Sequence, residues 1–204
     1  MIRRWLAAAT LALVVACAQD DTRPLKPAPT GAVPDTFRVA FETTRGRFVV
    51  EAYRAWAPIG VRRFYELASM GAFDENAFYR VVPNFVAQFG TPGDPKVTAQ
   101  LDSITLPDEK RIARNERGTV AFAQEKKDSR SHTIFINRRD NDYLDAQNFV
   151  PIGRVVQGMA VVDSLQWPYT DKPDHHMLAT IGNRYMRRNY PKADYIRSAV
   201  IVPR

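Results

Sequence analysis

The strongest signal in this chain is the stretch "AFYRVVPNFVAQFG", residues 77–90, which contains one charged side chain, Arg80. The other residues are almost wholly apolar or aromatic, and they predict two strands, at about 77–82 and 85–90. On this pattern alone, Arg80 is a strand arginine that extends its charged head to solvent. The alternative is a guanidinium that acts on a bound molecule.

Further strand-like runs flank this stretch on both sides. Residues 37–53 contain two of them around a Thr-Arg-Gly turn, which is typical of a hairpin. The others lie at 118–124, 132–137, 149–156 and 195–202. Residues 91–117 are polar, irregular and proline-containing, and they predict a long loop. Many short strands separated by long loops favour a mainly β fold, built as an antiparallel barrel.

Two segments have the periodicity of a helix. Within residues 57–73, apolar side chains recur at i, i+3, i+4 and i+7 from Val61. Pro58 suits the first turn of this helix, and Gly71 suits a C-terminal cap. Residues 158–165 predict a second, short helix with one apolar face. We expect these two helices to cover the ends of the barrel.

The composition suits one globular domain. The chain has 204 residues, of which 45% are hydrophobic and 25% charged, enough to bury a sizeable core. The formal net charge is +7, but no dense stripe of Lys and Arg demands an anionic partner, and we expect no nucleic-acid binding. The adjacent His175 and His176 lack a third residue at metal-ligand spacing, so we expect no metal site.

Residues 1–16 are predicted to be a signal peptide. Arg3 and Arg4 precede a short apolar run that ends at Ala16, which is typical of an export signal and too short for a spanning helix. The next residue is Cys17, and "LVVAC" is similar to the lipobox of bacterial lipoproteins, whose cysteine is lipidated. We therefore expect an exported, lipid-anchored protein of the cell envelope. The alternative is an ordinary signal peptide followed by an incidental cysteine.

Residues 17–36 are predicted to be a flexible tether between the lipid and a folded domain at 37–204. The segment is rich in Pro, Asp and Thr, and it has no apolar period. Cys17 is the only cysteine of the chain, so no internal disulfide can form. The domain must therefore be held together by its core.

Three segments together resemble the cyclophilin family of peptidyl-prolyl cis-trans isomerases. Residues 78–90 are similar to the family pattern Phe-His-Arg-Val-Ile-Pro-x-Phe-x-x-Gln-x-Gly. Residues 117–124, "RGTVAFAQ", are similar to Gly-x-x-x-Met-Ala-Asn. Residues 129–165 are similar to Thr-Ser-Gln-Phe-Phe-Ile, Trp-Leu-Asp and Phe-Gly-x-Val, followed by a Gly-Met helix. The resemblance covers about 37–165, and three motifs in the family order make a specific signal.

The resemblance implies a closed antiparallel eight-stranded barrel capped by two helices. It also implies an enzyme that accelerates rotation about X–Pro bonds in polypeptides, here exported ones. No covalent bond is made or broken in this reaction, so we expect no cofactor and no metal. The family resemblance also favours a monomer.

The chemistry of the reaction explains why a lone arginine is useful. Partial double-bond character gives the X–Pro bond a rotation barrier of about 18–20 kcal/mol. When the amide twists, the prolyl nitrogen regains a lone pair, and a donor aimed at it stabilises the transition state more than the ground state. Arg80 is always charged and carries a planar fork of donors, so we assign it as catalytic. By resemblance, Gln88 helps to orient Arg80 and binds the substrate carbonyl.

The resemblance also implies a set of substrate-binding residues. One group forms a pocket for the proline ring, in which Val86 stands where methionine is usual. A second group, Ala123 and Gln124, matches a pair whose backbone binds the extended peptide. The pocket residues are Phe85, Val86, Phe135 and Leu144, and the other predicted contacts are Ala123, Gln124, Thr133, Tyr143 and Asn148.

Besides Val86, four positions depart from the family pattern. Thr133 stands where glutamine is usual, so one amide that contacts the substrate is lost or replaced by a shorter hydroxyl. His132 stands where serine is usual, and Tyr79 replaces a histidine. Tyr143 replaces a tryptophan that is associated with cyclosporin binding, so we expect weaker affinity for that drug.

A further departure concerns the segment after Leu-Asp. The histidine that usually contacts the substrate there has no match, and either Asn148 or Phe149 falls at its position. Together these departures leave an alternative function open, which is a binding module or chaperone of the same fold with little turnover.

Overall fold

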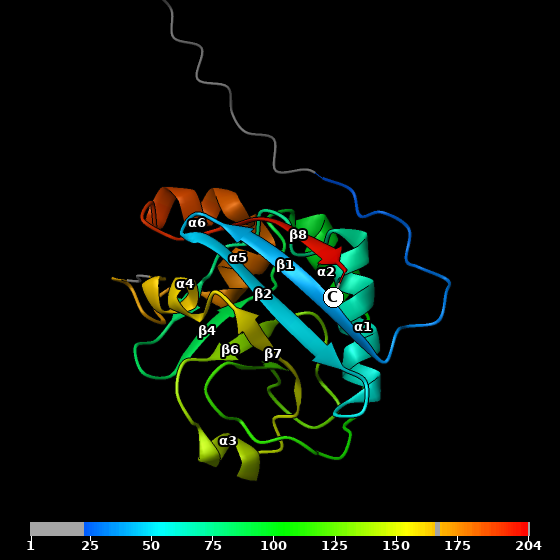
Figure 1. Ribbon diagram of the computed structural model, residues 1–204. Helices are drawn as coiled ribbons and strands as arrows, with labels where there is room; N and C mark the ends of the chain where they lie inside the picture. Colours follow the sequence, from blue (N-terminus) through cyan, green and yellow to red (C-terminus); the bar gives the residue numbers. More distant parts are fainter. Residues whose placement is uncertain (1–22, 166–167, 204) are drawn as a thin grey trace, which may run out of the picture.

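The computed structural model describes residues 23–165 and 168–203, which form one curled sheet surrounded by short helices (Figure 1). The strands are β1 (Thr36–Thr43), β2 (Gly46–Tyr53), β3 (Arg80–Val81), β4 (Val86–Phe89), β5 (Thr119–Phe122), β6 (Ile134–Asn137), β7 (Pro151–Gln157) and β8 (Ile196–Val202). The helices are α1 (Pro58–Met70), α2 (Pro95–Asp102), α3 (Asp142–Ala146), α4 (Met159–Ser164), α5 (His175–Ile181) and α6 (Asn183–Asn189).

The strands pair antiparallel in the order β3-β4-β6-β5-β7-β2-β1-β8. The prediction of a mainly β fold with eight antiparallel strands is confirmed, but the closed barrel is wrong, because the ladder is open and ends at β3 and β8. β3 has two residues, too few to form a ladder with β8. A bridge between Ala77 and Tyr195 and a hydrogen bond from Phe78 N to Asp194 O, at 2.9 Å, join the two ends.

The two predicted helices are confirmed as α1 and α4. Pro58 opens α1, and Gly71 caps its C-terminus with φ 75°, a left-handed conformation that glycine adopts without a steric cost. The apolar face of α1, which includes Val61, Phe64 and Leu67, is buried against β2, β7 and β8. This packing fixes α1 on the sheet.

Four further helices were not predicted. α2 lies inside 91–117, which the sequence predicts to be a loop, and α5 and α6 lie in the proline-containing segment before β8. Asp94 caps α2 through Lys96 N at 2.8 Å, and Pro95 follows at the first helical position. This Asp-Pro pair is a helix-start signal, but the helix behind it is too short to show a periodic pattern.

An aromatic cluster forms the centre of the core. The Phe41 ring lies 4.8 Å from Phe48 and 5.6 Å from Phe89, measured between ring centroids. Phe73 lies 5.8 Å from Phe41 and 5.7 Å from Phe64, so the cluster joins β1, β2, β4 and α1. Phe89 belongs to the stretch 77–90, which is therefore anchored directly in the core.

A carboxylate from the long loop caps α1. Glu109 accepts hydrogen bonds from the backbone of Ile59 and Gly60, each at 2.9 Å, at the N-terminus of the helix. The same carboxylate pairs with Arg130 at 2.9 Å, and the two side chains are 7% and 1% exposed. Ala57, the residue before the helix, provides no side-chain cap. Glu109 therefore holds together a loop, a helix and the segment that leads into β6.

Residues 23–35, part of the predicted tether, lie along the folded domain without helix or strand (Figure 1). Lys26 donates its backbone N–H to Met70 O at 3.0 Å, and Arg23 pairs with Asp74 at 3.1 Å. Leu25 and Val33 pack against the core. The described part of this segment is thus held at several points against the domain.

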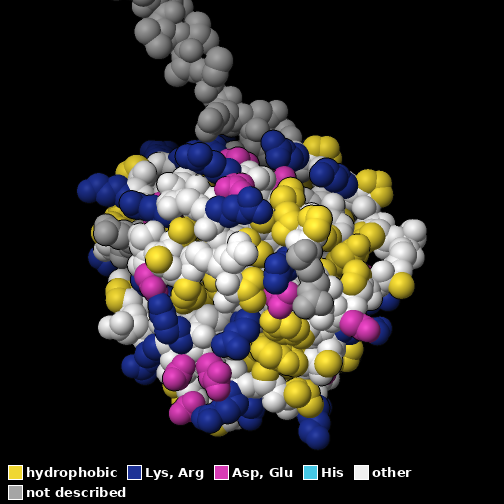
Figure 2. Space-filling view, viewed as in Figure 1, with side chains coloured by type: hydrophobic (Ala, Val, Ile, Leu, Met, Phe, Trp, Pro, Cys, Tyr) yellow, Lys and Arg dark blue, Asp and Glu magenta, His cyan; other side chains and the backbone are white. Residues whose placement is uncertain are grey.

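The surface carries both signs of charge. Figure 2 shows Lys and Arg side chains scattered over one face, interspersed with Asp and Glu and with apolar side chains. Within 23–165 and 168–203, no helix combines the length and the apolar character needed to cross a membrane.

Replacing Glu109 by Ala is expected to lower the free energy of unfolding by about 3–5 kcal/mol, because it removes the cap of α1 and leaves the buried Arg130 uncompensated. Urea unfolding of the purified protein measures this difference. Glu116→Ala, an exposed position in the same loop, serves as the control and should cost less than about 0.5 kcal/mol. Equal stability of the two variants would contradict the capping role.

Candidate functional site

The strand pleat separates a cleft from the core. On β6, Phe135 points into the cleft, whereas its neighbours Ile134 and Ile136 belong to the main core. On β4, Val86 points into the cleft and Ala87 belongs to the core. Successive side chains of a strand face opposite sides, so the same strands build both surfaces.

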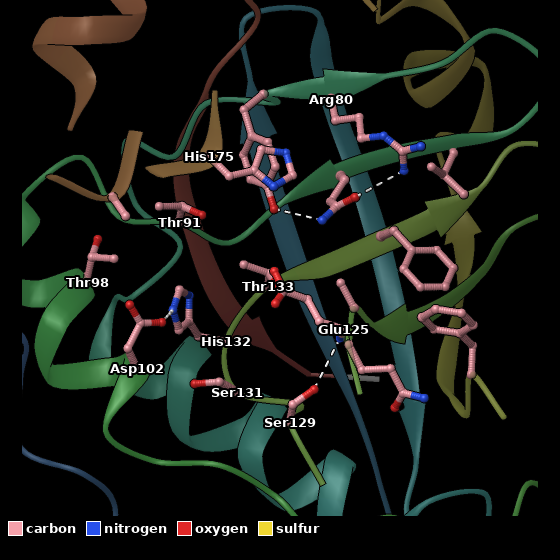
Figure 3. A pocket seen from close by; sticks show the side chains of 18 of the residues that line it. Arg80, Thr91, Thr98, Asp102, Glu125, Ser129, Ser131, His132, Thr133 and His175 are labelled. Atoms are coloured by element: carbon pink, nitrogen blue, oxygen red, sulfur yellow. Dashed lines mark hydrogen bonds and ion pairs between the residues drawn. The ribbon is translucent and has the colours of Figure 1, made fainter. Parts of the chain in front are cut away.

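A cavity of about 600 Å³ lies over these strands, and we call the parts with apolar and with polar lining its apolar lobe and its polar lobe (Figure 3). The apolar lobe is lined by Phe85, Val86, Ala123, Phe135, Leu144 and Phe149. The polar lobe is lined mainly by hydroxyl groups and one carboxylate, those of Thr91, Thr98, Thr105, Ser129, Ser131 and Asp102. Arg80 and Gln88 line the same cavity.

Most of the predicted site residues are brought together here. Nine of them line the cavity, namely Arg80, Phe85, Val86, Gln88, Ala123, Gln124, Thr133, Phe135 and Leu144. They come from segments up to about sixty residues apart in sequence, and their common position was expected only from the resemblance. Their roles in binding or catalysis stay predictions.

Two predicted residues lie outside the lining. Tyr143 is 46% exposed and stacks on Phe85 with ring centroids 5.7 Å apart, which places it at the rim. Asn148 adopts φ 58°, a left-handed backbone, and the cavity is lined instead by Phe149, whose ring lies 5.5 Å from Phe135. Of the two residues that the sequence left open at this position, Phe149 is the one that faces the cleft.

Arg80 is held at the edge of the apolar lobe. It pairs directly across the sheet with Gln88, and its Nη1 donates to Gln88 Oε1 at 3.4 Å. The guanidinium carbon lies 5.4 Å from the Phe85 ring centroid, a cation–π arrangement. Arg80 therefore directs hydrogen-bond donors toward the space above the apolar side chains, and it is not a strand arginine that only reaches solvent.

Tyr79, a departure from the family pattern, contacts Gln88 from the buried side. It is 1% exposed, and its hydroxyl accepts a hydrogen bond from Gln88 Nε2 at 2.8 Å. Burial raises the pKa of Tyr79 to about 12, so the hydroxyl keeps its proton at neutral pH. Thr91 and Thr133 also interact with this hydroxyl.

Helix α5 forms one wall of the cavity, which the sequence did not predict. His175, His176 and Ala179 line the cavity, and the His175 ring meets the Tyr79 ring edge-on at 4.9 Å. Asp174 caps α5 by accepting from Met177 N at 2.9 Å. This cap was the available signal, but the helix is too short for a periodic pattern.

The pKa of His175 lies below its ordinary value of 6.5. Partial burial of the ring is the main cause, and the charge of Arg80 lowers the pKa further, while Asp174 and Glu125 raise it. The residue as a whole stays exposed, so burial of the ring is incomplete. In the part of the chain that the structure describes, no group of three or more His, Cys, Asp or Glu side chains could hold a metal ion.

His132 ties the entry of β6 to α2. The residue is 2% exposed; its Nδ1 lies 2.8 Å from Gly90 O, and its Nε2 lies 2.7 Å from Asp102 Oδ1. Both partners are acceptors, so the two hydrogen bonds form together only when both ring nitrogens carry a proton. The departure at this position therefore has a structural use between the strand and the helix.

The backbone around Ala123 is partly occupied. Its N–H donates to Thr133 O at 2.9 Å, so this group is not available to a bound peptide. The Gln124 side chain donates to Gln147 O at 3.3 Å. The sequence predicts that the backbone of Ala123 and Gln124 pairs with an extended peptide. Backbone groups of these two residues other than the Ala123 N–H would have to make that pairing.

Comparison with known proteins gives one consistent result. The family model described as "Cyclophilin type peptidyl-prolyl cis-trans isomerase/CLD" matches residues 38–182. A peptidyl-prolyl cis-trans isomerase of Arabidopsis thaliana is 30% identical over 155 residues, which are 73% of this chain and 92% of that protein. One from Acinetobacter baylyi is 33% identical over 135 residues, 62% of this chain and 70% of that protein.

The fold is similar to solved structures of the same kind. A cyclophilin-type peptidyl-prolyl cis-trans isomerase of Cryptosporidium parvum superposes with a TM-score of 0.62 at 18% identity, covering 83% of this chain and 99% of that chain. A cyclophilin from Hirschia baltica gives a TM-score of 0.59 at 18% identity, covering 83% and 74%.

Removing the charge at position 80 is expected to raise the pKa of His175 toward 6.5, because Arg80 disfavours the protonated ring. An NMR titration of the His175 ring in the Arg80→Ala variant measures the change against the unmodified protein. Arg154→Ala removes an arginine on β7, outside the cavity lining, and should leave the titration unchanged. A His175 pKa that stays the same in Arg80→Ala would show that the two groups are not coupled.

Proposed function

The chain belongs to the cyclophilin-type peptidyl-prolyl cis-trans isomerase family and is an enzyme of that activity, and on this premise we propose that Arg80 is the group that lowers the rotation barrier. The observation that carries the proposal is the position of its guanidinium. The guanidinium carbon lies 5.4 Å from the Phe85 ring centroid, at the edge of an apolar lobe. It is the charged donor group that the lining offers beside this lobe.

The reaction needs a donor in that position. Rotation about an X–Pro bond removes the resonance between the prolyl nitrogen and the carbonyl, and the nitrogen becomes a hydrogen-bond acceptor. Arg80 donates to this nitrogen more strongly in the twisted state than in the planar one, which is the condition for lowering a barrier. A gain of about 5 kcal/mol in the twisted state corresponds to nearly 10⁴-fold in rate.

The apolar lobe is proposed to hold the proline ring. Phe135 and Leu144 are each 4% exposed and Val86 is 2% exposed, so the floor of this lobe is formed by closely packed side chains. A proline ring placed on this floor stabilises the complex by burying apolar area. Gln88, fixed beside Arg80, is placed to bind the carbonyl of the substrate. Every step is non-covalent, and polypeptides that contain proline are the substrates.

We also propose that the enzyme acts on exported proteins at the cell envelope. The support is the sequence of residues 1–17, in which a basic segment and a short apolar run precede Cys17. Residues 1–16 would be removed as a signal peptide, Cys17 would be lipidated, and 17–36 would connect the anchor to the domain. These residues up to Thr22 lie outside the described part of the chain. A monomer is expected.

The second candidate is a binding module or chaperone with little turnover. It rests on Thr133, a short hydroxyl at the position where the family pattern has an amide. The two candidates share the cavity and differ in rate, so a kinetic measurement on the purified protein separates them.

Replacing Arg80 by Ala is expected to lower kcat/KM for an Ala-Pro-Phe peptide by about 100-fold or more, because a donor to the transition state is lost. Arg62→Ala removes an arginine from the exposed side of α1 and serves as the control, with an unchanged rate. Equal rates for Arg80→Ala and the unmodified protein would refute the catalytic assignment. A rate in the presence of the unmodified protein no greater than the uncatalysed rate would favour the binding module.

Expression of the full chain in a bacterium with lipoprotein processing is expected to yield a membrane-bound product labelled by radioactive palmitate. Cys17→Ser removes the acceptor thiol and should abolish the label. The first residue of the mature chain provides a second readout. An unlabelled mature protein that begins at another residue would refute lipidation at Cys17.

A further inference from the structure

The hydroxyl of Tyr79 is a buried polar group that the proposed mechanism does not use. Tyr79 is 1% exposed and immediately precedes Arg80 in sequence. Its hydroxyl lies 2.8 Å from Gln88 Nε2, on the side of the amide opposite to Arg80. Gln88 thus stands between the two, and its two contacts are drawn as dashed lines beside Arg80 in Figure 3.

The two ends of the Gln88 amide are chemically different, and this fixes its orientation. Arg80 has only donors, so the amide oxygen must face it. The amide NH₂ then faces Tyr79, whose oxygen accepts the hydrogen bond. An amide turned by half a rotation would place NH₂ against the guanidinium, donor against donor. Arg80 therefore selects this orientation of Gln88, and Tyr79 stabilises it by accepting a second hydrogen bond from the same amide.

The Tyr79 hydroxyl is itself held in place. A hydroxyl carries one donor and two acceptor positions, and one acceptor position is used by Gln88. Thr91 and Thr133 interact with the same hydroxyl, so together with Gln88 three polar side chains surround it. The His175 ring packs on the tyrosine ring at 4.9 Å, and the side chain cannot turn away without disturbing α5.

Two departures from the family pattern meet at this point. Thr133 is shorter than the usual glutamine, and Tyr79 is longer than the usual histidine. The tyrosine hydroxyl interacts with the threonine side chain, and the two residues immediately precede β3 and β6. The change from glutamine to threonine at position 133 therefore goes together with the change from histidine to tyrosine at position 79, because Thr133 interacts with the Tyr79 hydroxyl that contacts Gln88.

We infer that Tyr79 is a positioning residue: its hydroxyl, supported by Thr133, orients Gln88 so that Gln88 holds the Arg80 guanidinium over the apolar lobe. The inference rests on the proposed role of Arg80. The contact from Arg80 Nη1 to Gln88 Oε1 is 3.4 Å, longer than an optimal hydrogen bond, so its geometry depends on how firmly the amide is held.

The protonation state of Tyr79 agrees with this role. Burial raises its pKa to about 12, so the hydroxyl keeps its proton over the whole range in which the enzyme is assayed. Tyr79 should therefore add no ionisation to the pH–rate profile below about pH 10.

The test is a double-mutant cycle of Tyr79→Phe and Gln88→Ala in purified protein. Tyr79→Phe removes the hydroxyl and keeps the ring, and we expect kcat/KM for an Ala-Pro-Phe peptide to fall roughly tenfold, the effect of one lost hydrogen bond. The loss should lie in kcat, with KM little changed, because the substrate floor is intact. In the Gln88→Ala background, Tyr79→Phe should have no further effect, since its only route to Arg80 has been removed.

Controls separate this role from a loss of structure. Tyr53→Phe removes a hydroxyl that donates to Glu51 on β2, away from the cavity lining, and it should leave the rate unchanged. NMR resonances of the Gln88 side-chain amide should move in Tyr79→Phe. Melting curves, with assays at 10 °C, confirm that each variant is folded. The positioning role of Tyr79 would be overturned if Tyr79→Phe lowered the rate equally in the unmodified protein and in Gln88→Ala. It would also be overturned if the Gln88 amide resonances did not move in Tyr79→Phe.

Arg80→Ala, measured in the same series, separates the two proposals. If Arg80→Ala keeps the rate of the unmodified protein, the catalytic assignment of Arg80 is wrong. If Arg80→Ala loses activity while Tyr79→Phe keeps full activity, the catalytic assignment of Arg80 holds and only the positioning role of Tyr79 is refuted.

Discussion

Successive side chains of β4, β5 and β6 alternate between the two faces of the sheet, and this alternation connects the core to the cleft. Phe89 packs in the aromatic cluster, while Gln88, its neighbour, lies beside Arg80. A shift of one residue in the pairing of β4 with β6 would exchange these faces and empty both. The site therefore needs no dedicated scaffold, because the register that fills the core also places Gln88, Val86 and Phe135 in the cavity.

The wall of the cavity depends on a second constraint, a buried ion pair. Arg130 lies between Ser129 and Ser131, which both line the polar lobe, and its own side chain points inward to Glu109. Burying two charges is costly unless they are paired and hydrogen-bonded, and the backbone donors at Ile59 and Gly60 meet part of that requirement. The long loop is thereby coupled to the cleft without contributing a catalytic group.

The sequence was most informative where a feature is local. The stretch 77–90 contains Arg80, Phe85, Val86 and Gln88; strand periodicity places Val86 and Gln88 on one face, and the motif adds Arg80 and Phe85. Longer-range features were not accessible. α2 and α5 have eight and seven residues, and helices of this length are stabilised by packing rather than by propensity. The open ladder follows from the two-residue β3, and the left-handed backbone of Asn148 decides that Phe149 faces the cleft.

The contacts of residues 23–35 with the domain have a mechanical consequence. Arg23 is paired to Asp74 and Lys26 is bonded to Met70, so if Cys17 carries the lipid, residues 17–22 are the length of chain between the anchor and the first of these contacts. About six residues, fully extended, reach roughly 20 Å. That reach is shorter than the diameter of a small domain, about 30 Å. A polypeptide would then meet the enzyme close to the bilayer surface, as it emerges there, rather than far out in the surrounding compartment.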